Sequence, residues 1–172
     1  LPDEDGYELW LRYRPVRDPQ LLAHYRAATA FVVQRGAGPM AQSMTDELSR
    51  ACQGMLARSS EAAQSVTAGG TILIGTPDAS PEIGQAIAAT DLAAAGNEGF
   101  LLRTMPINGH TTIVIAANHE RGLLYGVFAL VFLPFVYVSV LRGDDTNRAQ
   151  WVLAFTTLFM FGIALRSIST SI

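Results

Sequence analysis

Lysine is absent from this chain, and all 12 basic residues are arginines. A phosphate-binding loop of the form G-x-x-x-x-G-K-[ST] therefore cannot exist here, because its lysine is missing. The formal net charge is −3, and the arginines form no dense run. Nucleic-acid binding requires clustered cations, so composition argues against nucleic acid as a partner.

Cysteine and histidine are equally scarce. The single cysteine, Cys52, excludes an internal disulfide and a cysteine-rich metal site. It falls at helical spacing with Met44, Leu48, Met55 and Leu56, which predicts a buried apolar residue rather than a reactive thiol. The three histidines are predicted on a helix surface, in a turn and at a helix start, and they do not converge: His24, His110 and His119. We therefore predict no metal site, no cofactor site and no catalytic residue.

Periodicity and turn signals predict an α+β fold. Strands are expected at 7–13, 31–33, 71–74, 100–105 and 111–117, and helices at 42–58, 81–96 and 118–130. A further helix begins after Asp18-Pro19, with an inner face formed by Leu21, Tyr25 and Ala28. Asn108-Gly109 predicts a two-residue hairpin turn, because both residues tolerate positive φ. The order of elements predicts a mixed sheet with helices packed on it.

Several motifs suggest chemistry but have simpler interpretations. Residues 36–41 fit G-x-G-x-x-A, the dinucleotide-binding pattern, yet Pro39 removes an amide and no acidic residue ends a second strand about 20 residues later, so a surface loop is expected. Trp10 is a candidate platform for sugar stacking, although such a residue more often covers a helix or a domain interface. Neighbouring acids do not supply the opposed pair that a glycosidase needs. They are interpreted as helix-start acids (Asp46, Glu47), solvated loop residues (Asp144, Asp145) and a mobile terminus (Asp3, Glu4, Asp5).

Four segments carry a resemblance to a known family. EDGYELWLRYRPV at 4–16, GTPDASPEIG at 75–84, GNEGFLLRT at 96–104 and IAANHERGLLYGVF at 115–128 resemble, in order, the N-terminal domain of the family 67 α-glucuronidases. These enzymes remove glucuronic acid side groups from xylan fragments. The resemblance implies a hexosaminidase-like accessory domain in which Gly122 and Gly126 permit close helix packing.

The same resemblance implies that catalysis resides elsewhere. The family carries its catalytic carboxylates in a (β/α)₈ barrel, which needs about 250 residues and does not fit in 172. The chain alone is therefore expected to be catalytically inactive. Xylan-derived glucurono-xylooligosaccharides would be bound through the missing barrel.

The last part of the chain is strongly apolar. Residues 123–141 and 151–165 carry no charged side chain. We expect an α-glucuronidase-like domain at 1–131 and an apolar helical tail at 132–172. A bilayer is crossed by roughly 20 helical residues, so the first run is long enough and the second is short. A membrane hairpin would make the chain a membrane-anchored, non-enzymatic binding module; the alternatives are a gene fusion or a read-through past an exon end. Secretion is expected, with membrane association through residues 123–165 as the alternative.

Overall fold

The structure is a computed structural model that describes residue 13 and residues 15–136. By contacts the chain divides into two compact units, Leu1–Phe132 and Leu133–Ile172. The strand expected at 7–13, Trp10 and the acids Asp3, Glu4 and Asp5 fall outside the described residues, apart from Tyr13, which is not in a strand. The tail beyond residue 136, with Asp144, Asp145 and the run at 151–165, also falls outside them.

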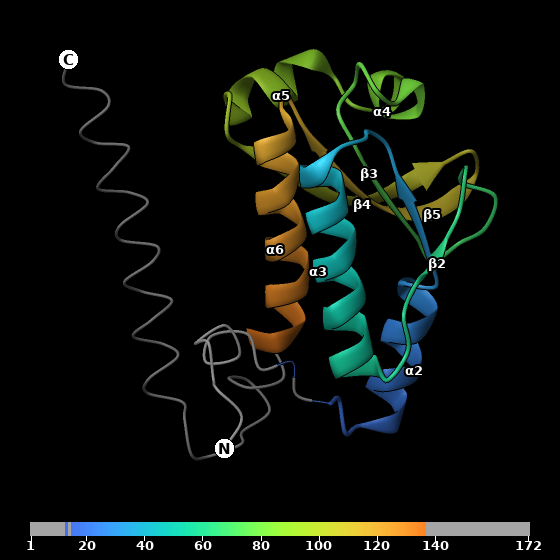
Figure 1. Ribbon diagram of the computed structural model, residues 1–172. Helices are drawn as coiled ribbons and strands as arrows, with labels where there is room; N and C mark the ends of the chain where they lie inside the picture. Colours follow the sequence, from blue (N-terminus) through green and yellow to red (C-terminus); the bar gives the residue numbers. More distant parts are fainter. Residues whose placement is uncertain (1–12, 14, 137–172) are drawn as a thin grey trace, which may run out of the picture. The chain divides into compact units, whose positions relative to one another are not determined.

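A five-stranded mixed sheet forms the centre of the domain (Figure 1). Its order is β2-β1-β3-β5-β4, and the strands are β1 (Phe31–Gln34), β2 (Glu61–Ala62), β3 (Thr71–Gly75), β4 (Phe100–Ile107) and β5 (His110–Ala117). Neighbouring strands are parallel except for β4, which pairs antiparallel with β5 at one edge. The predicted α+β class with a mixed sheet is therefore confirmed, whereas β2 was not predicted.

Helices cover both faces of this sheet. They are α2 (Pro19–Ala28), α3 (Pro39–Leu56), α4 (Pro81–Ala86), α5 (Ala89–Ala95) and α6 (Glu120–Val136). The face formed by Val33, Leu73 and Val114 packs against Ile83 of α4, Leu92 of α5 and Ile87 between these two helices, and all six are at most 5% exposed. In Figure 1, α3 and α6 run along the opposite, front face of the sheet.

The packing of α6 depends on two glycines. A side chain at Gly126 would collide with the Ile115 side chain of β5, and one at Gly122 would lie 2.8 Å from Ala117 Cβ. Glycine therefore lets the helix backbone approach the strand more closely than any other residue allows. This confirms the predicted close packing of α6.

The predicted helix starts are confirmed where serine or aspartate precedes proline. The Asp18 carboxylate accepts hydrogen bonds from the backbone N–H groups of Gln20 and Leu21, and Ser80 Oγ accepts one from Ile83 N–H. Each cap satisfies backbone donors that have no partner within the first turn. The expected inner face of α2 is only half-buried, because none of its residues is fully covered.

Other helix boundaries differ from prediction. The single helix expected at 81–96 is two helices, because Ile87 is extended (φ −114°, ψ 125°). This break buries Ile87 in the same apolar cluster as Ile83 and Leu92. The helix expected at 42–58 begins earlier, at Pro39, where proline costs no hydrogen bond.

Asn118 was predicted to cap the helix at 118–130, and its observed bonds are different. Its side-chain amide donates to the carbonyl oxygens of Leu92 (2.8 Å) and Gly96 (2.9 Å), at the C-terminal end of α5. The backbone carbonyl of His119, the residue before α6, accepts hydrogen bonds from the N–H groups of Gly122 (3.0 Å) and Leu123 (3.3 Å). Asn118 therefore ties α5 to the end of β5.

The hairpin prediction is confirmed. Ile107 of β4 pairs with His110 of β5, so the turn contains two residues. Asn108 has φ 51° and Gly109 has φ 81°. Both therefore adopt the left-handed backbone that a tight hairpin turn of this length requires.

Candidate functional site

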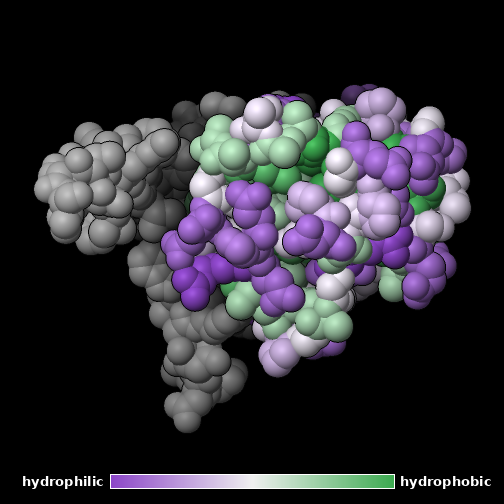
Figure 2. Space-filling model, turned by 90° about the horizontal axis from the view of Figure 1, so that it is seen from above, coloured by the Kyte–Doolittle hydropathy of each residue, from purple (hydrophilic) through white to green (hydrophobic). Residues whose placement is uncertain are grey.

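The fold places one candidate site where β1 and β3 end side by side. These neighbouring parallel strands are followed by helices on opposite faces: α3 after β1 and α4 after β3. In open α/β sheets, ligands bind outside the carboxyl ends of the strands at such a switch point. Figure 2 looks down on this end of the molecule, where hydrophilic and hydrophobic residues are interspersed.

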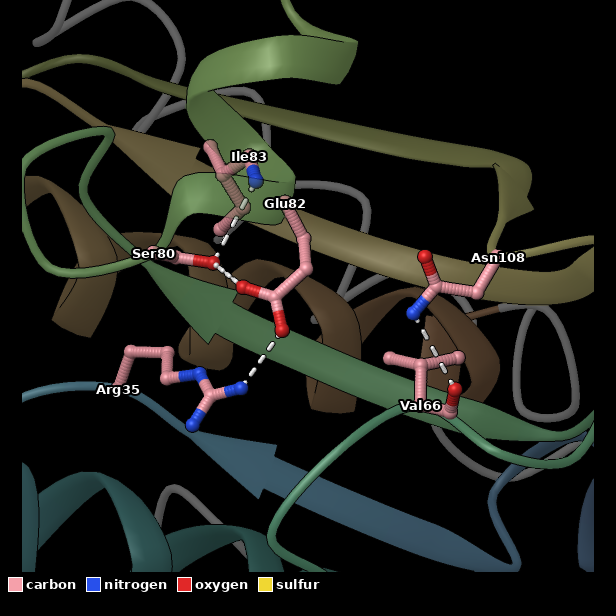
Figure 3. A network of polar contacts seen from close by, with 6 residues as sticks. All are labelled: Arg35, Val66, Ser80, Glu82, Ile83 and Asn108. Carbon is pink, nitrogen blue, oxygen red and sulfur yellow. Dashed lines mark hydrogen bonds and ion pairs between the residues drawn. The ribbon is translucent and has the colours of Figure 1, made fainter.

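An ion pair joins the two strand ends (Figure 3). Arg35, directly after β1, places its guanidinium Nη2 2.7 Å from Glu82 Oε1 in the first turn of α4. Ser80 Oγ donates to the other Glu82 oxygen at 2.9 Å. Ser80 is fully buried, and the side chains of Arg35 and Glu82 are 25% and 19% exposed. The protein's own side chains thus interact across the switch point.

The electrostatics of Glu82 favour its charged form. The hydrogen bond from its own backbone N–H, followed by those from Arg35 and Ser80, lowers the pKa of Glu82 below its ordinary value. A glycosidase general acid needs the reverse, a raised pKa that keeps the carboxyl protonated. Glu82 is therefore an anionic partner for Arg35 and not a proton donor at neutral pH.

Gly75 makes the close approach of these groups possible. A Cβ at Gly75 would lie 2.9 Å from Arg35 Cβ and 3.3 Å from Ser80 Cβ. Two buried side-chain atoms at the end of β1, Gln34 Oε1 and Arg35 Nε, have no hydrogen-bond partner. Each such atom costs about 1–3 kcal/mol. Close packing at Gly75 and the opposite charges of Arg35 and Glu82 thus hold the pair in place, while the two unpartnered atoms oppose it.

The G-x-G-x-x-A pattern lies at the same end of the sheet: Gly36–Gly38 form an exposed loop, as predicted, whereas Pro39–Ala41 form the first turn of α3. Gly36 and Gly38 have φ values of 112° and 108°, and α3 then begins at Pro39. The strand that follows α3 is β2, which the sequence analysis did not predict, and it contains an acidic residue, Glu61. Glu61 aligns with Phe31, roughly 13 Å of strand before Arg35, so it lies near the opposite end of β1 from the loop. A dinucleotide with its pyrophosphate at the glycine loop could not place its ribose against Glu61.

Asp46 and Glu47 are not helix-start acids, because α3 begins at Pro39 and places them about two turns inside the helix. Asp46 is exposed and accepts a hydrogen bond from Gln42 Nε2 at 2.7 Å. Glu47 is 3% exposed, accepts a hydrogen bond from the Tyr13 hydroxyl and pairs with Arg50 at 3.1 Å. A buried carboxylate needs such partners. The sequence contains one indication of this burial: Glu47 follows Met44 by three residues and precedes Ala51 by four, which places all three on one face of the helix.

The remaining candidate residues occupy separate places. His24 is exposed on α2, His110 begins β5 and His119 precedes α6. Within residues 13 and 15–136, no three metal-ligating side chains come together. Cys52 is 4% exposed beside Ser60, and burial raises the pKa of its thiol, so the interpretation as a buried apolar residue is confirmed.

Comparison with known proteins decides the family. Residues 9–130 match the family described as Glycosyl hydrolase family 67 N-terminus. The chain belongs to this family.

One solved structure that matches is described as "A novel family GH115 4-O-Methyl-alpha-glucuronidase, BtGH115A, with specificity for decorated arabinogalactans". Sequence identity is 25%, the TM-score is 0.47, and the match covers 60% of this chain and 13% of that one. The matched residues are a small share of that enzyme's length. No curated protein sequence matches this chain.

The membrane interpretation gains no support from the structure. Among the helices that the structure describes, none is both long and apolar enough to cross a bilayer. The run at 123–141 is described only as far as the end of α6 at Val136. Membrane association through the tail stays a prediction from composition.

Proposed function

We propose that this family 67 domain is the accessory N-terminal domain of an α-glucuronidase that removes glucuronic acid side groups from xylan fragments. The family match over residues 9–130 carries this proposal, because that family is the N-terminal part of a glycoside hydrolase. The reaction itself is assigned to a catalytic barrel, which would bind the glucurono-xylooligosaccharide. The domain contributes to the folding and stability of that enzyme.

Several of the carboxylates that the structure describes serve as ion-pair partners or helix caps, which supports a non-catalytic role. Glu47 and Glu82 are engaged by arginine in covered positions, and Asp91 and Glu98 pair with arginines at the surface. Asp18 caps a helix. A glycosidase needs one carboxyl group with a raised pKa and a second carboxylate facing it across the scissile bond. The pKa of Glu82 is lowered, chiefly by its own backbone N–H, which is the opposite of what a general acid needs.

Activity measurement tests the first half of the proposal. The purified chain should release no 4-O-methylglucuronic acid from aldouronic acids above a no-enzyme control. Release that disappears when one acid of this chain is replaced by its amide would show that the domain is catalytic.

A domain exchange tests the accessory role. In a complete family 67 α-glucuronidase, residues 1–131 of this chain would replace the enzyme's own N-terminal domain. The hybrid should retain activity on aldouronic acids, whereas the same enzyme with the domain deleted should lose soluble expression. A hybrid as poorly expressed as the deletion would argue against the accessory role.

A further inference from the structure

The hairpin turn contains a chemically labile pair of residues. Asparagine is among the thermally labile side chains, and a following glycine leaves its backbone nitrogen unhindered by any side chain. The chain has four asparagines, and Asn108 alone precedes glycine. Asn97 precedes Glu98, Asn118 precedes His119, and Asn147 precedes Arg148.

Asn108 is also the less protected of the two described asparagines that form side-chain hydrogen bonds. Asn108 and Gly109 are both exposed and lie outside the β4–β5 ladder, which ends at Ile107 and His110. The Asn108 amide makes one bond, to Val66 O at 3.4 Å, which is long for an N–H···O contact (Figure 3). Asn118, by contrast, is half-buried and donates two bonds shorter than 3 Å.

We propose that Asn108 is a site of spontaneous deamidation, at which the chain modifies itself with water as the only co-reactant. The Gly109 backbone nitrogen attacks Asn108 Cγ, so an N–Cγ bond forms while the Cγ–Nδ2 bond breaks. The Gly109 amide proton leaves with Nδ2 as ammonia. Water then opens the resulting five-membered succinimide at either carbonyl, which produces aspartate or isoaspartate at position 108.

The modification acts on a part of the hairpin that borders the core. Conversion removes the amide donor and leaves a carboxylate facing the Val66 carbonyl oxygen, which is repulsive. Isoaspartate also lengthens the backbone of a turn that contains two residues, and Ile107 and Val66 beside it are 4% and 2% exposed. Deamidation should therefore loosen the end of the hairpin.

Peptide mapping by mass spectrometry tests the proposal on the full chain, kept in detergent where needed. The folded chain is held in mildly alkaline buffer together with a synthetic peptide of residues 105–112. Aspartate and isoaspartate should accumulate at position 108 while Asn97 and Asn118 in the same digest stay intact. Amide exchange at His110 should rise in the modified fraction.

Two variants sharpen the test. Asn108→Gly removes the reacting side chain and keeps a residue that tolerates positive φ, so this chain should show neither product. Asn108→Asp should reproduce the faster amide exchange without incubation. The proposal is overturned if Asn108 stays intact in the folded chain while the peptide converts, or if Asn97 and Asn118 convert as fast as Asn108.

Discussion

Replacing Glu82 should weaken the domain, because this one carboxylate joins the ends of β1 and β3. In Glu82→Gln, Arg35 loses its charged partner at 2.7 Å and Ser80 Oγ loses a charged acceptor at 2.9 Å. Exposed ion pairs contribute about 0–1 kcal/mol, whereas removing one partner of a buried pair costs about 3–5 kcal/mol. The pair here is 25% and 19% exposed, between these limits. We expect the free energy of unfolding to fall by about 2 kcal/mol at neutral pH.

The effect should depend on pH with a definite sign. The pKa of Glu82 is lowered in the folded protein, chiefly by its own backbone N–H, so the unfolded chain binds this proton more tightly. The stabilisation is then complete above the ordinary glutamate pKa of about 4.3 and is lost as the pH falls through the lower folded-state value. The difference between wild type and Glu82→Gln should shrink below about pH 4.

Urea denaturation followed by circular dichroism, on a shortened chain that ends at Val131, measures both effects. Asp91→Asn is the matched control, because Asp91 pairs with Arg103 at 2.9 Å in a more exposed pair, with side chains 38% and 52% exposed respectively. That variant should lose at most about 1 kcal/mol. If Glu82→Gln costs no more than the control, or if its effect does not diminish in acid, the Arg35–Glu82 pair does not hold the strand ends together.

Three further perturbations test the packing and the tail. Gly109→Val should destabilise the domain by about 1 kcal/mol or more, because a β-branched residue resists φ 81°; an unchanged thermal melt would contradict this. Gly126→Ala should also lower the melting temperature, since crowding against Ile115 costs about 1–3 kcal/mol and helix propensity returns about 1 kcal/mol. A raised melting temperature would show that α6 can move away from the sheet. Residues 1–172 should require detergent while a chain ending near Val131 does not, because each large apolar side chain left uncovered in the tail forgoes about 1.5–3 kcal/mol of burial. Size-exclusion chromatography in plain buffer decides this, and a monodisperse full chain beside an aggregated short one would place the tail in the soluble core.

Local signals in the sequence determined much of the fold. The Asn108-Gly109 turn, the caps at Asp18 and Ser80 and the buried strand at 71–74 were all predicted, because each depends on residues within a few positions of one another. The helical spacing around Cys52 likewise predicted its burial. The family was also recognisable, because its segments keep their order along the chain.

The tertiary structure alone decided the features that depend on distant partners. β2 has two exposed residues and therefore no hydrophobic pattern to reveal it. The break at Ile87 follows from burial against the sheet, not from any breaker residue. The helical spacing of Glu47 from Met44 and Ala51 indicates the buried face of α3, but only the tertiary structure shows that Tyr13 and Arg50 are its partners. Arg35 and Glu82 are 47 residues apart, and only the parallel pairing of β1 with β3 brings the ends of these strands together.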